Sequence, residues 1–282
     1  MNQHHLETLI VNALHEDIGD GDHSTLSCID KHVSGKAVLK IKEDTVIAGV
    51  EIAEKIFKMA DASVYFKPSK KDGEQVQNGE IAFEVFAPVL TILKCERLVL
   101  NTMQRMSGIA TLTRQYTDLL KGYHTRLLDT RKTTPNFRLL EKEAVRIGGG
   151  ENHRFGLYDM IMLKDNHIDY CGSIEKAIQL AYDYVQSSKP GLKIEVETRT
   201  LEDVKKVIAT GKVDRIMLDN FTVEDIQSAL LLINRKFETE ASGGITLSNL
   251  KSYASTGVDF ISCGALIHQA KSVDLSLKAV II

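Results

Sequence analysis

The sequence has no tryptophan, only four prolines and four cysteines, and no apolar run that approaches a membrane span of ~20 residues. Cys28, Cys95, Cys171 and Cys263 lie far apart and form no C-x-x-C pair, which argues against a zinc site or a disulfide framework. We therefore expect reduced thiols, most of them buried, and no membrane partner.

An excess of either charge is also missing, since the formal net charge is -3 over 282 residues. Nucleic acids and anionic membranes are bound by a dominant basic field, so neither is expected as the main partner. The first residues include Glu7, Glu16 and Asp17 and have no apolar signal segment. These absences predict a cytoplasmic protein that recognises its ligands through local groups.

The first part of the chain is typical of an α+β unit. Apolar residues from Leu6 to Leu14 at helical spacing predict an opening helix, and a second helix is expected over Glu51–Ala60. Short β-prone stretches lie around the second helix at Lys36–Ile41, Thr45–Ala48, Ser63–Lys67 and Ile81–Phe86. Because strands and helices do not alternate strictly, we expect a mixed sheet with its helices on one face.

A helical stretch from Val89 to Gly122 follows, in which the Ser107-Gly108 pair predicts a break between two helices and a domain boundary. Beyond it, short apolar strands alternate with helices. The expected strands are Arg126–Leu128, Met160–Leu163, Lys193–Val196, Arg215–Leu218, Phe237–Ala241 and Asp259–Ser262. The expected helices are Ile174–Val185, Leu201–Ala209, Val223–Asn234 and Leu247–Ser255. Repeated strand-helix units with apolar strands predict a parallel sheet.

Polar residues follow each of these strands at the same end. They are Asp129, Arg131 and Lys132; Lys164 and Asp165; Glu197; Asp219; Ser242, Gly243 and Gly244; and Gly264. In a β/α barrel such strand ends converge on the face that holds the active site, and glycine loops after the last strands bind phosphate there. About 150 residues is short for a barrel of ~250 residues, so we expect a shortened, incomplete barrel.

The chemistry of this face suits an anionic ligand. Arg131, Lys132, His153, Arg154 and Lys164 bring cations together, although exposed ion pairs with nearby carboxylates are an alternative. Glu197 and Asp219 are suited to hydrated Mg²⁺ or to sugar hydroxyls.

Two residues of this region have other possible roles. Glu195 shares a side of its strand with Glu197, so it is a candidate for a structural carboxylate inside the barrel, paired with Lys193 or a lysine of a neighbouring strand. Lys164 at a strand end is alternatively a candidate for a Schiff base in an aldolase-type barrel.

Several segments closely resemble the quinolinate phosphoribosyltransferase family, also called nicotinate-nucleotide pyrophosphorylase (carboxylating). They occur in order from EDIGDGDHST near the N-terminus, through LLDTRKTTPNFR and GGGENHRFGLYDMIMLKDNH, to IEVETRT, IMLDN, EASGGI and GVDFISCGALIH. The family often has glycine where this chain has Asn136, which also tolerates left-handed backbone angles.

The resemblance implies an α/β fold with an N-terminal α/β sandwich domain and a shortened, incomplete β/α barrel. It places the sandwich at residues 1–107, rejoined by the C-terminal segment 270–282, and the barrel with the active site at residues 108–269. The implied enzyme is a homodimer with shared active sites. It makes nicotinate mononucleotide, pyrophosphate and CO₂ from quinolinate and phosphoribosyl pyrophosphate for NAD synthesis, with Mg²⁺ and no organic cofactor.

The resemblance also implies residue roles. Arg131, His153, Arg154 and Lys164 bind the two carboxylates of quinolinate, together with Arg105 from the partner subunit. Lys132, Glu197 and Asp219 are the catalytic residues, and the latter two hold Mg²⁺, directly or through water. The residues implied to bind phosphoribosyl pyrophosphate are Thr130, Lys132, Glu197, Asp219, Ser242, Gly243, Gly244, Gly264, Ala265 and His268.

Three alternatives stay open from the sequence. The first is a related phosphoribosyltransferase that acts on nicotinate or another planar carboxylic acid. The second is the aldolase that uses Lys164, and the third is a phosphate-binding barrel without catalysis. The number of cations, which exceeds the need of one carboxylate, favours quinolinate.

Overall fold

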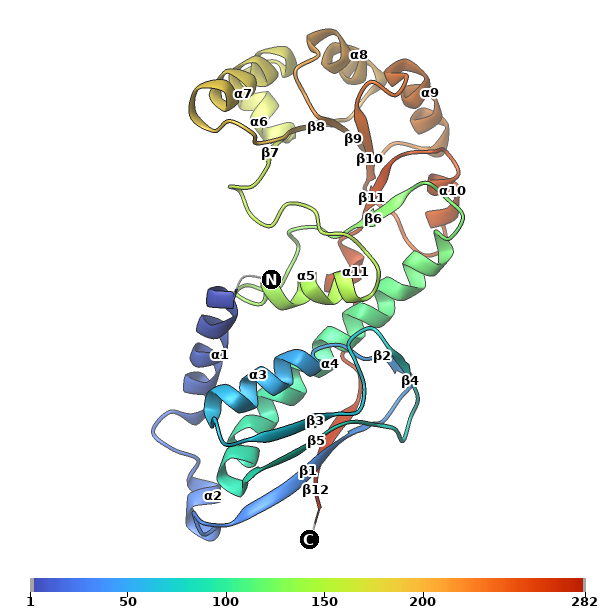
Figure 1. Ribbon diagram of the computed structural model, residues 1–282. Coiled ribbons are helices and arrows are strands. Elements are labelled where there is room, and N and C mark those ends of the chain that lie inside the picture. The colour runs from blue at the N-terminus through green and yellow to red at the C-terminus, as the bar shows by residue number, and fades with distance from the viewer. Residues whose placement is uncertain (1–2, 281–282) are drawn as a thin grey trace. The chain divides into compact units, whose positions relative to one another are not determined.

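The protein is seen in a computed structural model that describes residues 3–280 (Figure 1). The chain divides into two compact units. The first contains the residues up to Arg114, Thr133–Gly149 and the residues from Leu266 on, and the second contains Gln115–Lys132 and Gly150–Ala265. No helix in residues 3–280 has both the length and the apolar character needed to cross a membrane.

The first unit is built on a four-stranded sheet in the order β12-β1-β5-β3. Its strands are β1 (Ser34–Ile41), β3 (Tyr65–Pro68), β5 (Ile81–Pro88) and β12 (Leu275–Val280). All three pairings are antiparallel, so the expectation of a mixed sheet was wrong. The C-terminal strand β12 pairs along β1 from Lys36↔Val280 to Ile41↔Leu275, which brings the end of the chain into the first sheet.

Smaller elements complete the first unit. A two-stranded sheet joins β2 (Thr45–Val46) to β4 (Gln75–Val76). The helices are α1 (Gln3–Ile18), α2 (His23–Cys28), α3 (Val50–Ala60), α5 (Arg138–Ile147) and α11 (Ala265–His268), the last beginning at the final residue of the second unit.

Aromatic rings link α3 to the sheet of the first unit. The ring centroid of Phe83 on β5 lies 4.5 Å from that of Phe66 on β3 and 6.2 Å from that of Phe57 on α3. Phe57 and Phe83 are fully buried. Such aromatic pairs contribute about 1 kcal/mol each beyond the area that they bury.

A single long helix, α4 (Val89–Leu119), runs from the first unit into the second. It continues through Ser107 and Gly108, so the predicted break between two helices at this pair was wrong. Packing explains why this position is glycine, because a Cβ at Gly108 would lie 1.9 Å from the carbonyl oxygen of Lys271. The C-terminal segment crosses α4 at the one residue without a side chain.

The second unit contains six parallel strands in the order β6-β11-β10-β9-β8-β7. They are β6 (Arg126–Leu128), β7 (Ile161–Leu163), β8 (Ile194–Thr198), β9 (Arg215–Asp219), β10 (Glu238–Ser242) and β11 (Phe260–Ser262). A bridge from Leu128 to Glu151 extends the β6 edge. Within residues 3–280 no ladder joins β6 to β7, and the predicted incomplete β/α barrel is confirmed.

Helices lie along the outside of this sheet (Figure 1). They are α6 (Asp165–Cys171), α7 (Ile174–Ser188), α8 (Leu201–Thr210), α9 (Val223–Ile233) and α10 (Leu250–Ala254). The hydroxyls of Ser173, Thr200 and Thr222 accept hydrogen bonds from the first turns of α7, α8 and α9. These caps satisfy backbone N–H groups that a helix start otherwise leaves unpaired, so each helix begins soon after the preceding strand.

The four thiols are free but differ in exposure. Cys95 and Cys263 are buried, Cys171 is partly exposed and Cys28 is exposed. Burial raises the pKa of Cys95 to about 11, which keeps this thiol protonated at neutral pH. The expectation of mostly buried thiols therefore holds for two of the four.

Substituting Gly108→Ala tests the crossing over α4. Alanine favours a helix over glycine by about 1 kcal/mol, but the clash with a backbone oxygen outweighs this gain. We expect the free energy of unfolding in urea to fall by about 2 kcal/mol. Asn101→Ala, at an exposed position of the same helix, is the control and should raise this free energy slightly, by roughly 0.5 kcal/mol, since alanine is the better helix former. A Gly108→Ala variant as stable as wild type would contradict the close approach.

Candidate active site

The carboxyl ends of the six parallel strands bring together most of the predicted site residues. Lys164 follows β7, Glu197 lies near the end of β8, and Asp219 and Ser242 are the last residues of β9 and β10. Ser242 and Asp219 are direct register partners. Because parallel strands in register end at one edge, residues up to 78 positions apart in the sequence share this face.

Lys164 and Glu197 form an ion pair on this face, with Nζ 2.9 Å from Oε2. The lysine side chain is half exposed, whereas only 8% of the Glu197 side chain is accessible. The backbone N–H of Asp165 donates to the other oxygen of Glu197 at 3.4 Å. Nζ of Lys164 is therefore engaged by a protein carboxylate, whereas a Schiff-base lysine must present its nitrogen to a substrate carbonyl.

Asp219 adds a second carboxylate beside Glu197. Burial raises the pKa of Asp219, and the nearby charge of Glu197 raises it further. Lys164 and the side chains of Asn220 and Ser242 act in the opposite direction. Mg²⁺ binds one or two protein carboxylates and completes its shell with water and phosphate oxygens. The two carboxylates fit this ion, since the protein offsets their repulsion only in part and a divalent cation would relieve the rest.

Two guanidinium groups stand close together on the same face. Burial lowers the pKa of Arg154, and the positive charge of Arg131 lowers it further. Nη1 of Arg154 also donates to the carbonyl oxygen of Met160 at 3.3 Å. Adjacent guanidinium groups repel each other, and a bound carboxylate or phosphate removes this repulsion by accepting from both.

The loop after β10 has the backbone of a close-approach turn. Gly243 and Gly244 have φ of 93° and 61°. A Cβ at Gly243 would lie 2.2 Å from Oδ1 of Asn220, whose Nδ2 donates to Asp219 at 2.6 Å. Gly264 and Ala265 follow the neighbouring strand β11, so both glycine loops lie at the same edge.

The segment after β6 contributes Thr130 and Lys132. The hydroxyl of Thr130 accepts a hydrogen bond from the backbone N–H of Lys132 at 3.0 Å. Lys132 itself is exposed. Asp129 beside them is fully buried and accepts hydrogen bonds from the Asn152 side chain and the His153 backbone, so it ties the end of β6 to the segment that carries Arg154.

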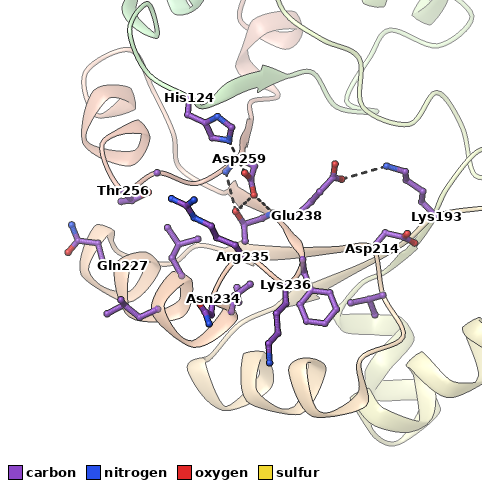
Figure 2. Close-up of a pocket in the computed structure, with 17 residues that line it drawn as sticks. His124, Lys193, Asp214, Gln227, Asn234, Arg235, Lys236, Glu238, Thr256 and Asp259 are labelled. Atoms are coloured by element: carbon purple, nitrogen blue, oxygen red, sulfur yellow. Dashed lines mark hydrogen bonds and ion pairs between the residues drawn. The ribbon is translucent and has the colours of Figure 1, made fainter.

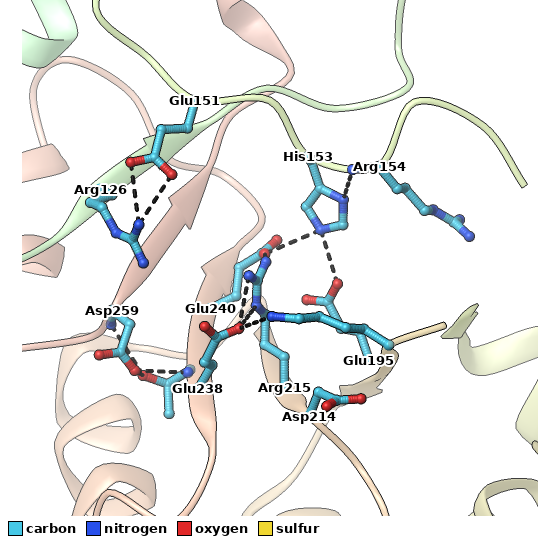
Figure 3. Close-up of polar contacts among 12 residues, drawn as sticks. Arg126, Glu151, His153, Arg154, Glu195, Asp214, Arg215, Glu238, Glu240 and Asp259 are labelled. Carbon is cyan, nitrogen blue, oxygen red and sulfur yellow. Dashed lines mark hydrogen bonds and ion pairs between the residues drawn. The ribbon is translucent and has the colours of Figure 1, made fainter. Parts of the chain in front are cut away.

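His153 differs from its predicted role. Its Nε2 lies 2.9 Å from Glu195 and 3.2 Å from Glu240, inside the barrel (Figure 3). Its Nδ1 accepts the backbone N–H of Arg154 at 2.6 Å. Both ring nitrogens therefore face protein groups, and the prediction that His153 grips a ligand carboxylate directly was wrong for this structure.

Sequence reasoning missed most of this buried cluster. Glu195 was predicted as a carboxylate inside the barrel, but its partner is His153, whereas Lys193 lies 3.7 Å from Glu238. Arg215 on β9 pairs with Glu240 at 3.0 Å. The available signal was the occurrence of charged residues within otherwise apolar strands.

The buried charges shift one another's titration. Burial lowers the pKa of His153 and the carboxylates of Glu195 and Glu240 raise it, whereas the acceptor role of Nδ1 towards the N–H of Arg154 requires the neutral ring. Burial and the charge of Glu240 raise the pKa of Glu195 to about 7, despite the opposing effect of His153.

Known proteins match both units. The family described as "Quinolinate phosphoribosyl transferase, C-terminal domain" matches residues 109–278, and its N-terminal domain matches residues 22–107. The chain belongs to the quinolinate phosphoribosyl transferase family.

Individual members of the family are similar along almost the whole of this chain. "Nicotinate-nucleotide pyrophosphorylase [carboxylating], chloroplastic" of Oryza sativa subsp. japonica is 44% identical over 97% of this chain and 77% of its own. "Probable nicotinate-nucleotide pyrophosphorylase [carboxylating]" of Bacillus subtilis (strain 168) is 43% identical over 98% and 94%. The crystal structure of NadC from Streptococcus pyogenes is 40% identical, with a TM-score of 0.92 over 100% of this chain and 99% of its own.

Two predicted site residues of this family member belong to the first unit. His268 is exposed at the end of α11. Arg105 on α4 donates to Glu141 at 2.9 Å, to the carbonyl oxygen of Ala270 at 2.7 Å and to that of Ile267 at 2.8 Å. Its three nitrogens are therefore held by its own chain, so the prediction that Arg105 reaches a partner subunit's site needs correction.

A cavity of about 1250 Å³ opens at the opposite, amino-terminal ends of the strands (Figure 2). Lys193, Asp214 and Glu238 line it together with Arg235 and Lys236. No predicted site residue of the described chain is among its lining residues. In β/α barrels this end serves stability rather than catalysis, so we place the candidate active site at the carboxyl ends.

Alanine at Gly243 or Gly244 separates two effects in the phosphate loop. Both substitutions force a left-handed backbone, at a cost of about 1–2 kcal/mol. Only the Cβ at position 243 clashes with Asn220, because nothing lies within 4 Å of the one at position 244. We expect Gly243→Ala to lower the free energy of unfolding by about 1–3 kcal/mol more than Gly244→Ala. Equal losses in denaturant titrations would argue against the packing of Asn220 on this loop.

Proposed function

We propose that the chain transfers phosphoribosyl from phosphoribosyl pyrophosphate to quinolinate and releases pyrophosphate and CO₂. The observation that carries this proposal is the strand-end face, where Arg131, Arg154 and Lys164 lie with Glu197 and Asp219. The names of the similar proteins support the same reaction. The product, nicotinate mononucleotide, would enter NAD synthesis.

Quinolinate carries two adjacent carboxylates, which match the cations of the face. Arg131 and Arg154 together offer two planar donor groups, and Lys164 offers a point charge. The repulsion between the two guanidinium groups is relieved when a carboxylate lies between them. The binding energy would hold the pyridine nitrogen towards the ribose.

Phosphoribosyl pyrophosphate has a place beside these cations. Ser242, Gly243, Gly244, Gly264 and Ala265 would surround the 5′-phosphate with backbone N–H groups, which need no side chain at the glycines. The nearby residues assigned to the ribose and pyrophosphate are Thr130, Lys132, Glu197 and Asp219. We leave His268 as a proposed contact of the phosphate.

The reaction needs charge of both signs. As the C1–pyrophosphate bond breaks, the ribose gains oxocarbenium character, which Glu197 and Asp219 stabilise, while Lys132 stabilises the departing pyrophosphate. Mg²⁺ held near Glu197 and Asp219 would neutralise pyrophosphate charge when it is bound. Bond formation makes the pyridine nitrogen cationic, and this charge stabilises the electron pair that departing CO₂ leaves on the adjacent ring carbon. A proton from water then adds to this carbon, so the step needs no organic cofactor.

The alternatives make different demands on the face. Nicotinate has one carboxylate, so it leaves at least one of the three cations without a ligand anion. An aldolase requires Nζ of Lys164 to attack a substrate carbonyl, but this nitrogen is paired with Glu197 at 2.9 Å. A binding module without catalysis gives no task to the neighbouring carboxylates of Glu197 and Asp219.

Product formation tests the reaction directly. We expect nicotinate mononucleotide and CO₂ from quinolinate, phosphoribosyl pyrophosphate and Mg²⁺, and at least about a hundredfold lower kcat/KM with nicotinate, because a paired carboxylate contributes about 3 kcal/mol. Chromatography measures the nucleotide formed from each acid, and trapping of labelled CO₂ measures the decarboxylation of quinolinate. Activity with nicotinate and none with quinolinate would identify nicotinate as the substrate. Inactivity with both, in protein that is folded and binds phosphoribosyl pyrophosphate, would refute the transferase.

A homodimer with shared sites, in the cytoplasm, remains part of the proposal. An arginine of α4 can reach the partner's site only if its own chain does not already hold its guanidinium group. Of its three arginines, Arg105 and Arg114 donate to carbonyl groups of their own chain. Arg97 is exposed and, within residues 3–280, forms no ion pair. We therefore assign the shared role to Arg97 in place of Arg105.

Mixing variant subunits tests this assignment. Arg97→Ala and Arg131→Ala should each be folded and inactive, and their mixture should regain roughly a quarter of wild-type activity, since about half of the dimers are mixed and each holds one intact site. Arg105→Ala should instead lose stability, because Glu141 is then buried without its guanidinium partner. Recovery with Arg105→Ala but not with Arg97→Ala would reverse the assignment.

A further inference from the structure

Beneath the strand-end face lies a buried charge cluster that the proposed reaction does not use (Figure 3). It contains Glu195 on β8, Glu240 on β10 and Arg215 on β9, with His153 above them in the chain segment that leads to Arg154. Glu195 and Glu240 are fully buried. Burying four ionisable groups is costly, so the cluster requires an explanation beyond stability.

Arg215 holds the cluster in place through contacts with Glu240, Glu238 and Phe260. Nη1 of Arg215 lies 3.0 Å from Glu240, and Nη2 lies 3.0 Å from Glu238. The same guanidinium stacks at 4.0 Å on the ring of Phe260. Arg215 is therefore immobilised, and it fixes the Glu240 carboxylate at the height of the His153 ring.

A bound metal is one conceivable use, because one ligand atom from each of His153, Glu195 and Glu240 lies within 4.8 Å of the others. The hydrogen bonds of His153 argue against it. Nδ1 accepts the N–H of Arg154 and is then unprotonated, so the proton of the neutral ring is on Nε2. The charged ring carries a proton on both nitrogens and cannot accept the N–H of Arg154, so this contact belongs to the neutral ring. The proton on Nε2 then faces the carboxylates, and this nitrogen has no lone pair for a metal.

The orientation of His153 determines the position of Arg154. Three contacts hold this part of the backbone: Asp129 accepts the N–H of His153 at 2.8 Å, Nδ1 accepts the N–H of Arg154 at 2.6 Å, and the carboxylates hold Nε2. Arg154 must stay beside Arg131 although their charges repel. A fixed backbone opposes the displacement that this repulsion favours.

We propose that Glu195 and Glu240 are positioning residues that act through His153 to hold Arg154 in the carboxylate-binding geometry. This inference rests on the proposed function, since it assigns the effect to quinolinate binding. The order of contacts runs from Phe260 through Arg215, Glu240 and His153 to Arg154. Neither glutamate needs to touch the substrate.

The isosteric variants Glu195→Gln and Glu240→Gln test the proposal in the full-length protein. We expect the KM for quinolinate to rise about tenfold or more, with the KM for phosphoribosyl pyrophosphate and the amount of folded protein little changed. Glu238→Gln is the matched control, because Glu238 also contacts Arg215 but is partly exposed and is not an ion-pair partner of His153. A change in thermal stability with both KM values unchanged would show a merely structural role and overturn the proposal.

A double-variant cycle with Arg154→Lys identifies the route. If the glutamates act through Arg154, adding Glu195→Gln to Arg154→Lys should raise the KM for quinolinate by much less than it does in wild type. Fully multiplicative effects would overturn the proposed route. Glu195→Asp, which keeps the charge, should recover part of the loss.

Two measurements on wild-type protein separate the failure of this inference from that of the function. Calorimetry with quinolinate alone should show binding; absence of binding there together with absence of turnover would refute the proposed function. Imidazole NMR should show a slowly exchanging proton on Nε2 of His153, assigned by its loss in His153→Gln. A metal-bound or solvent-exchanging Nε2 would overturn the inference even if the enzyme is active and the glutamine variants do not fold.

Discussion

The parallel alignment of six strands is the constraint on which the second unit depends. Each strand is short, from three to five residues, and its register with its neighbours decides which residues share the edge of the sheet. Asp219 and Ser242 face each other because their strands pair in register, and the loops after Ser242 and Ser262 follow at the same edge. A shift by one residue would turn Glu197 from the inner side of its strand to the side packed by helices.

The charges of this unit are arranged at two levels with different consequences. At the face, Lys164 pairs with Glu197, while Arg131 remains close to Arg154 and Asp219 close to Glu197. Like charges that act on each other raise the free energy of the unliganded site, and a ligand of opposite charge removes this repulsion. Below the face, Arg215 pairs with Glu240 and Nε2 of His153 lies 2.9 Å from Glu195, because buried charges without partners would cost several kcal/mol each.

Local pattern was sufficient for most strands and helices and failed where distant residues meet. Apolar periodicity predicted all six barrel strands to within one or two residues at each end. The predicted break in α4 was wrong because glycine at position 108 is required by the close approach of the Lys271 backbone, 163 positions later, and does not end the helix. The helix α5 was missed, and it belongs to the first unit although its sequence lies between two barrel strands. Asn136, predicted to tolerate a left-handed backbone, has φ of 61°.

The sequence by itself determined which chemistry the face offers, because strand ends, glycine loops and the types of charged residues are all local features. Arg131, Arg154, Lys164, Glu197 and Asp219 were predicted for this reason. Only the tertiary structure decided which groups are paired. His153 turns to Glu195 and Glu240, and Arg105 turns to Glu141, because ion-pair partners are set by packing between segments far apart in the chain. The sequence gives the charge of each residue, but the fold determines which residue is its ion-pair partner.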